Sequence, residues 1–126
     1  MEKVLVIDGR QVRFKSTGAF LLRYKAQFQR DALVDVYKME NAYGEETYEE
    51  DGKTLTRVIV KDVNAIDLEI LYNLIWTLAK TADANILPPM EWLDTFEAFP
   101  LNDIFPELME MLRSCLSPTA ESKKKI

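Results

Sequence analysis

The sequence predicts an α+β fold in which an N-terminal β-hairpin is followed by a mainly α-helical bundle of four to five helices. Near the start, two short runs of strand-favouring residues flank an Asp-Gly pair, which is a strong signal for a tight hairpin turn. Farther along the chain, apolar residues recur at steps of three and four, the period of an amphipathic helix. With 126 residues, of which 48% are apolar and 29% charged, the chain has the composition of a globular domain.

The predicted hairpin covers residues 3–15, KVLVIDGRQVRFK. Asp8 and Gly9 both tolerate the positive φ angles that a two-residue type I′ turn requires. The second strand alternates apolar with charged residues, so one of its faces needs cover. Because an isolated hairpin is at best marginally stable in water, we expect helices to pack against that face.

Two helical segments follow, GAFLLRYKAQF at 18–28 and ALVDVYKMEN at 32–41. Their spacing predicts the inward-facing residues Leu21, Tyr24 and Phe28 in the first segment and Leu33 and Val36 in the second. The two segments form either one long helix or two helices with a bend near Arg30. Neither glycine nor proline marks a break there, so the sequence leaves both alternatives open.

Residues 41–53, NAYGEETYEEDGK, are predicted to be a loop because two glycines bracket four glutamates and an aspartate. The loop does not fit a calcium-binding EF-hand. Aligning Gly52 with the glycine of such a loop places Thr47 and Val58 where carboxylates are needed. Residues 54–60, TLTRVIV, are either a short strand, available as a third strand for the hairpin, or the approach to the next helix.

The clearest predicted helix follows Asp62 or Asn64, either of which can cap it. Its apolar stripe comprises Leu71, Leu74, Ile75, Leu78 and Ala82, and Leu68, Ile70 and Trp76 widen it. A stripe this wide is typical of a largely buried helix. We therefore expect this helix to be central and to pack against both the first helices and the C-terminal ones.

Two more helices are predicted near the C-terminus. The first begins at Pro89 and ends at Pro100, and Trp92, Phe96 and Phe99 form its aromatic face. The stripe of the second comprises Ile104, Leu108, Leu112 and Cys115, with Pro106 expected in or just before its first turn. Because Pro118 ends this helix, we predict a single domain over residues 1–117 and a flexible basic tail over 118–126.

The residue types present exclude several kinds of chemistry. The chain has no histidine and one cysteine, so imidazole catalysis, a histidine-bound metal and a thiolate cluster are all excluded. Its four glycines form no nucleotide-binding motif, so we expect neither a cofactor nor an enzyme. A net charge of −5 argues against nucleic acid as a partner, and no segment is apolar enough to span a membrane. With no signal peptide evident and no disulfide possible, a cytosolic protein is expected.

Partner binding is the expected alternative to catalysis. Four apolar residues, Trp92, Phe96, Phe105 and Met109, can line a groove between the last two helices that accepts an amphipathic helix of another protein. The other interpretation is that these residues fill the core. Arg23 and Arg30 lie in a basic N-terminal third and suit phosphate or an acidic patch on a second copy of the chain. The net charge favours the second copy, and hence self-association.

The order of these elements resembles the tail assembly chaperones of long-tailed bacteriophages and prophages of Gram-positive bacteria, over essentially the whole chain. The most telling positions are Tyr24 with Phe28, Arg30 and Asp31; Ala79-Lys80 and Asp83; Glu91-Trp92-Leu93 with Phe96; and Glu121-Ser122-Lys123-Lys124-Lys125. One position departs from the family pattern. Where the family commonly has a glycine before the Arg-Asp pair, Gln29 stands here, which argues against a sharp bend at that point.

The resemblance implies a non-enzymatic role in viral tail morphogenesis. Such chaperones bind and solubilise the tape measure protein in the host bacterial cytoplasm, help to recruit tail tube subunits, and are absent from the mature virion. They are often made in two forms through a programmed frameshift. The three consecutive lysines of the tail, which need adenine-rich codons, are then interpreted as a slippery site. The alternative is a small phage-encoded helical adaptor or regulator that binds a folded protein partner.

Overall fold

A computed structural model describes residues 1–116 of the chain. The elements are β1 (Glu2–Ile7), β2 (Arg10–Lys15), α1 (Phe20–Phe28), α2 (Ala32–Glu40), β3 (Tyr43–Glu50), β4 (Lys53–Val60), a 3₁₀ turn (Val63–Ala65), α3 (Leu68–Ala82), α4 (Pro89–Asp94) and α5 (Leu101–Leu116). The predicted α+β class, with an N-terminal hairpin before the helices, is confirmed. The predicted basic tail and its lysines lie outside the described residues.

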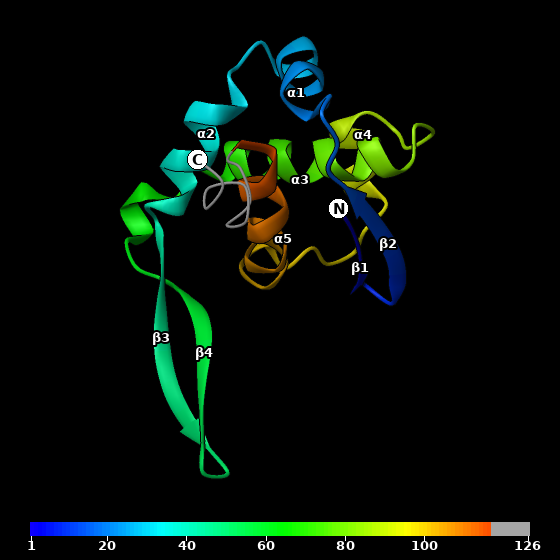
Figure 1. Cartoon of the computed structure of the whole chain (residues 1–126). Coiled ribbons are helices and arrows are strands. Elements are labelled where there is room, and N and C mark those ends of the chain that lie inside the picture. Colours follow the sequence, from blue (N-terminus) through cyan, green and yellow to red (C-terminus); the bar gives the residue numbers. More distant parts are fainter. Residues whose placement is uncertain (117–126) are drawn as a thin grey trace.

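Helix α3 lies at the centre of the fold and contacts α1, α2, α4, α5 and the strand β2 (Figure 1). The prediction of a central, largely buried helix is therefore confirmed, because Leu71, Leu74, Ile75 and Leu78 are all buried. The cap, however, is Asp67, whose side chain accepts a hydrogen bond from the N–H of Ile70, while Asp62 caps the preceding 3₁₀ turn. Each of the other helices described thus packs against α3.

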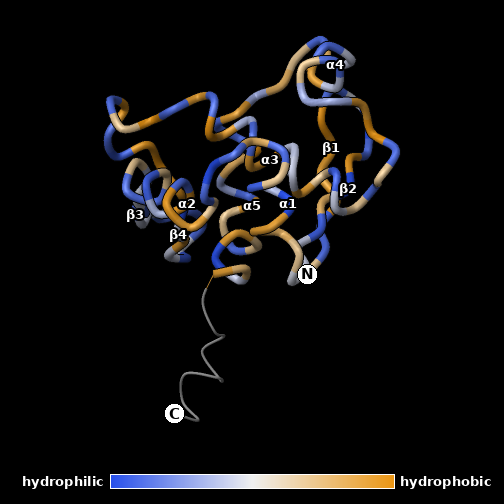
Figure 2. Tube along the Cα trace, turned by 90° about the horizontal axis from the view of Figure 1, so that it is seen from above, coloured by the Kyte–Doolittle hydropathy of each residue, from blue (hydrophilic) through white to orange (hydrophobic). Residues whose placement is uncertain are grey.

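The strands β1 and β2 form the predicted hairpin, with Asp8 and Gly9 in its turn at φ angles of 53° and 76°. Phe14 on β2 is fully buried beneath α3, so the amphipathic face is covered as expected. The opposite face of β1 carries Val4 and Val6, both exposed. Figure 2 shows this hairpin on one side of α3 and the pair β3 and β4 on the other.

The prediction of a loop over residues 41–53 is wrong, because most of that segment forms the strand β3. It pairs with β4 in a second antiparallel hairpin whose turn, Asp51-Gly52, has the same two positive φ angles as the first. The strand could not be recognised from its sequence, because a ribbon with both faces in water needs no alternation of apolar and polar residues and β3 is rich in acidic ones. Residues 54–60 are a strand, but they pair with β3 rather than with the N-terminal hairpin.

The segments α1 and α2 are two helices separated by a sharp bend at Gln29. Gln29 has a φ of 55° and donates its backbone N–H to the carbonyl of Lys25, in the left-handed cap conformation that usually selects glycine. The sharp bend is therefore present although Gln29, and not a glycine, occupies the cap. Leu21 and Leu33 were expected to face inward and are instead exposed. The residues before them, Phe20 and Ala32, take the buried places.

Replacing Gln29 by glycine should raise the free energy of unfolding by about 0.5–1 kcal/mol, because the left-handed conformation costs a residue with a Cβ more than it costs glycine. The matched control is Gln27→Gly, which makes the same change at an exposed position inside α1. That variant should lower the free energy of unfolding by about 0.5–1 kcal/mol. Urea denaturation of both variants checks the pair, and equal destabilisation by both would contradict the role assigned to Gln29.

The C-terminal helices differ from the predicted ones in two respects. Helix α4 ends at Asp94, although the side chains of Trp92, Phe96 and Phe99 still meet edge to face in the turn that follows. Pro106 was expected in or before the first turn of α5 and lies in its second turn, because the helix already begins at Leu101. Proline has no N–H to donate, so the carbonyl four residues earlier, that of Asn102 in the first turn, lacks the partner that an uninterrupted helix would give it.

Candidate functional site

The six residues predicted to bind a partner do not come together in one site. Trp92 and Phe96 lie beyond α3 with ring centroids 5.1 Å apart, whereas Phe105 and Met109 belong to α5. The Phe105 ring packs 5.3 Å from that of Tyr43. All four apolar side chains are buried. In this structure they therefore fill the core, which is the second interpretation given to them above.

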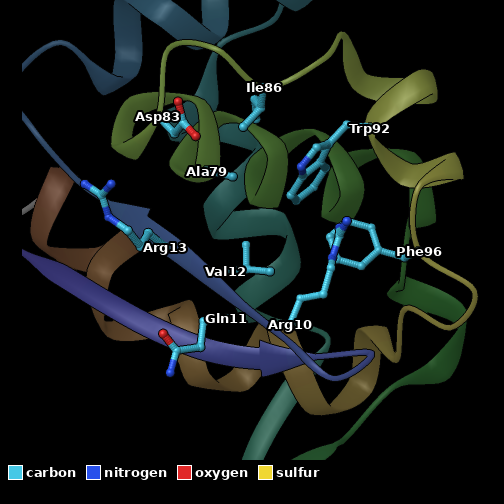
Figure 3. Close-up of a pocket in the computed structure, with 9 residues that line it drawn as sticks. All are labelled: Arg10, Gln11, Val12, Arg13, Ala79, Asp83, Ile86, Trp92 and Phe96. Atoms are coloured by element: carbon cyan, nitrogen blue, oxygen red, sulfur yellow. The ribbon is translucent and has the colours of Figure 1, made fainter.

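Trp92 and Phe96 border a small cavity of about 230 Å³ beside the N-terminal hairpin (Figure 3). The Arg10 guanidinium lies 3.8 Å from the centroid of the Phe96 ring and donates a hydrogen bond to Thr95 Oγ1 at 3.0 Å. Arg13 donates to the carbonyl of Ala82 at 3.2 Å. Arg13 thus joins β2 to the last residue of α3, and Arg10 joins β2 to the segment that follows α4. We therefore assign these contacts a structural role.

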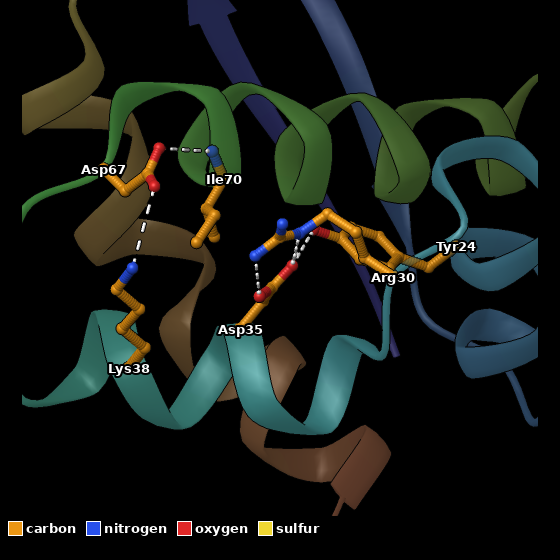
Figure 4. Close-up of polar contacts among 6 residues, drawn as sticks. All are labelled: Tyr24, Arg30, Asp35, Lys38, Asp67 and Ile70. Atoms are coloured by element: carbon orange, nitrogen blue, oxygen red, sulfur yellow. Dashed lines mark hydrogen bonds and ion pairs between the residues drawn. The ribbon is translucent and has the colours of Figure 1, made fainter.

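Arg30 is held by a buried carboxylate rather than presented to a partner (Figure 4). Its guanidinium donates to both carboxylate oxygens of Asp35 at 2.8 Å, and the Tyr24 hydroxyl donates to the same carboxylate at 2.6 Å. Burial by itself would raise the pKa of Asp35, but the hydrogen bonds from Arg30 and Tyr24 and nearby positive charge lower it. This cluster closes the bend between α1 and α2.

Helices α1 and α2 also present exposed apolar side chains. Five exposed side chains cover the outer faces of the two helices, and we call them the α1–α2 apolar surface: Leu21, Leu22, Leu33, Val34 and Tyr37. Leu22 is 75% exposed and Val34 is 61% exposed. Exposed apolar residues are common singly, but a group on two adjacent helices is typical of an interaction site.

Two hollows flank the Leu21-Leu22 pair. One, of about 200 Å³, lies at the α1–α2 corner and includes Leu21, Leu33 and Val34 in its lining. The other, of about 440 Å³, lies between α1 and α3, and its lining comprises Ala19, Leu22, Arg23, Ala26, Gln27, Trp76 and Lys80. The two neighbouring leucines therefore form a ridge with a hollow on each side, a shape that can receive the side chains of a partner helix.

The larger hollow has a positive rim. Arg23 and Lys80 both line it, and no carboxylate occurs among its described lining residues. Lys25, two residues after Arg23 on α1, is paired with Asp31 at 3.3 Å. Of the six predicted residues, Arg23 is the one that lines a hollow beside the α1–α2 apolar surface. The surface combines apolar contact area with local positive charge on an acidic protein.

The sequence contained a signal for this surface that the helical period alone did not reveal. Three consecutive apolar residues occur in each helix, Phe20 to Leu22 and Ala32 to Val34. Successive residues of a helix point about 100° apart, so three in a row cannot all face a core that lies on one side of the helix. Such a run on a short helix predicts that at least one large apolar side chain is exposed.

Comparisons with protein-family models, with curated proteins and with solved structures gave no match. None of the helices described over residues 1–116 is both long and apolar enough to cross a membrane. Within the same residues, no three histidine, cysteine or acidic side chains are grouped so that they could hold a metal ion. Function therefore has to be inferred from the surfaces.

Proposed function

We propose that this protein is a phage tail assembly chaperone that binds the tape measure protein through the α1–α2 apolar surface. The observation that carries the proposal is the group of exposed apolar side chains on two adjacent helices, beside two hollows. A tape measure protein is a long helical chain that aggregates before the tail tube assembles around it. A surface that covers apolar helical residues would prevent that aggregation.

Binding is proposed to occur by insertion of apolar side chains from a partner helix on either side of the Leu21-Leu22 ridge. Arg23 and Lys80 then attract acidic residues that flank the inserted ones. The net charge of −5 keeps the complex soluble. Many copies bind along one long chain, so the total binding is strong although each single contact is weak.

The proposal includes the setting of this activity. The chaperone acts in the host bacterial cytoplasm, helps to bring tail tube subunits to the coated tape measure protein, and is not part of the mature virion. Copies on neighbouring sites associate through Arg23 and Lys25 of α1 and the acidic residues between 83 and 97. The longer form produced by a frameshift at the lysine codons belongs to the same proposal.

Co-expression with the tape measure protein of the same phage tests the proposal. The wild-type chain should raise the soluble yield of the tape measure protein severalfold, and Leu22→Glu or Val34→Glu should abolish most of that gain. These two positions are exposed, so a charge there opposes apolar contact without disturbing the core. The measurement is the soluble fraction of the tape measure protein after centrifugation.

The matched control is Leu68→Glu, which places the same charge at a helical leucine that is 57% exposed and lies outside the α1–α2 apolar surface. It should retain the wild-type gain. Equal loss in all three variants would remove the assignment of the site to α1 and α2. No gain with the wild-type chain would favour the alternative, an adaptor that binds a folded partner.

A further inference from the structure

The second hairpin, formed by β3 and β4 over residues 43–60, projects from the helices as an arm (Figure 1). At its base Tyr43 is buried against Phe105, whereas the outer residues of both strands are largely exposed. Across the arm, the Arg57 guanidinium lies 4.7 Å from the centroid of the Tyr48 ring and pairs with Glu46. Because a two-stranded ribbon in water is marginally stable, an arm of eight-residue strands is suited to pairing with a further strand.

The two edges of the arm are chemically different. Glu50 and Lys53 flank a two-residue turn, and the alternation of an antiparallel ladder then directs the N–H groups of every second residue outward. On β3 these outward residues are Tyr43, Glu45, Thr47 and Glu49; on β4 they are Thr54, Thr56, Val58 and Val60. Charged residues protect the β3 edge from pairing. The outward residues of β4 are all β-branched and uncharged, which favours strand addition at this edge.

A cleft of about 490 Å³ lies beside β4 and not beside β3. Its lining comprises Thr56, Arg57 and Val58 of the arm, Asn102, Asp103, Pro106, Glu107 and Glu110 of α5, and Lys3. The Lys3 ammonium already pairs with Glu107 at 2.8 Å, and Arg57 pairs with Glu46. Asp103 and Glu110 therefore leave the cleft with a negative field that is open to a positively charged occupant.

We propose that the β4 edge of the arm binds an extended, lysine- or arginine-bearing segment of another protein, which adds to the arm as a third strand. The backbone of that segment pairs with the outward groups around Thr56, and its basic side chains face Asp103 and Glu110 across the cleft. A second arm fits less well, because residues 43–60 hold five acidic side chains against two basic ones. This site is separate from the α1–α2 apolar surface and does not depend on the proposed chaperone function.

The test uses the full chain and a fluorescein-labelled ten-residue peptide of alternating lysine and valine. Binding measured by fluorescence anisotropy should weaken as salt is raised, and a peptide of alternating glutamate and valine should not bind. Thr56→Pro removes one outward N–H without removing a bond within the arm and should weaken binding about tenfold or more. Thr47→Pro makes the same change at the residue directly opposite, on the β3 edge, and should weaken binding less than about twofold.

The charge contribution is tested separately with Asp103→Asn combined with Glu110→Gln, which should weaken binding several-fold at low salt and little at high salt. Hydrogen exchange of the wild-type complex locates the peptide independently of any variant that fails to fold. Slower exchange at Thr54, Thr56 and Val58 supports the proposal. Protection of the β3 edge instead would overturn it. So would an equal loss of binding in both proline variants while the arm is still folded. A wild-type dimer that Thr56→Pro dissociates would overturn it as well.

Discussion

Replacing Arg30 by alanine is expected to lower the free energy of unfolding by about 2–3 kcal/mol at neutral pH. The change leaves the Asp35 carboxylate, which is almost fully buried, with the Tyr24 hydroxyl as its remaining partner. Breaking a fully buried ion pair costs about 3–5 kcal/mol, and the expected loss is smaller here because the Arg30 side chain is 45% exposed. Urea denaturation at pH 7 measures the change.

The cost should depend on pH, and the sign follows from Asp35. In the wild-type protein the pKa of Asp35 is lowered, so its ionised form stabilises the fold above the ordinary pKa of an aspartate, and this stability is lost as the pH falls. Without Arg30, burial dominates and raises the pKa of Asp35. The variant then loses stability as the pH rises from the ordinary pKa of an aspartate toward that raised pKa, and the difference in stability between the two proteins should shrink as the pH falls.

The control for the Arg30–Asp35 ion pair is Lys25→Ala, because Lys25 forms a neighbouring ion pair with Asp31 in which both partners are exposed. Its expected cost is below about 0.5 kcal/mol and depends on salt. Tyr24→Phe should cost about 1–2 kcal/mol through the lost hydrogen bond to Asp35. A pH-independent cost for Arg30→Ala, equal to that of Lys25→Ala, would contradict the role given to the buried carboxylate.

Local signals in the sequence were sufficient for elements with one strong determinant. The turn at Asp8 and Gly9 and the wide apolar stripe of α3 depend on residues that are near neighbours, and both were predicted correctly. The arm was missed although Asp51-Gly52 repeats the first turn signal. Its strands have both faces largely in water, so the alternation that identifies a half-buried strand is absent.

The candidate site was harder to predict, because exposure depends on what covers each residue. Trp92 and Phe105 are the kind of large aromatic residues expected in a binding groove, yet both are buried in the folded chain. Leu22 and Val34 remain exposed, because Phe20 and Ala32 occupy the inward positions of the same helices. The helical period predicts which residues share a face of the helix, whereas tertiary packing decides which face is covered.

Replacing Phe105 by alanine should lower the free energy of unfolding by about 3–5 kcal/mol. The Phe105 side chain is fully buried on α5, and its ring packs 5.3 Å from Tyr43 at the base of the arm. Removal of a buried aromatic ring loses its transfer free energy and leaves a cavity that the neighbours fill only in part. Urea denaturation measures the loss, and hydrogen exchange should show that the arm opens more often than in the wild-type protein.

Leu22→Ala is the matched comparison, because it also removes an apolar side chain but from an exposed position. Its cost in unfolding free energy should stay within about 0.5 kcal/mol. Its effect on the soluble yield of a co-expressed tape measure protein should, however, exceed the effect of Phe105→Ala, when both are measured below the unfolding transition. The opposite pattern, with Phe105→Ala folded as stably as the wild-type chain and defective in binding, would return the site to the last two helices. The pair thus separates a residue that builds the domain from one that the domain presents to a partner.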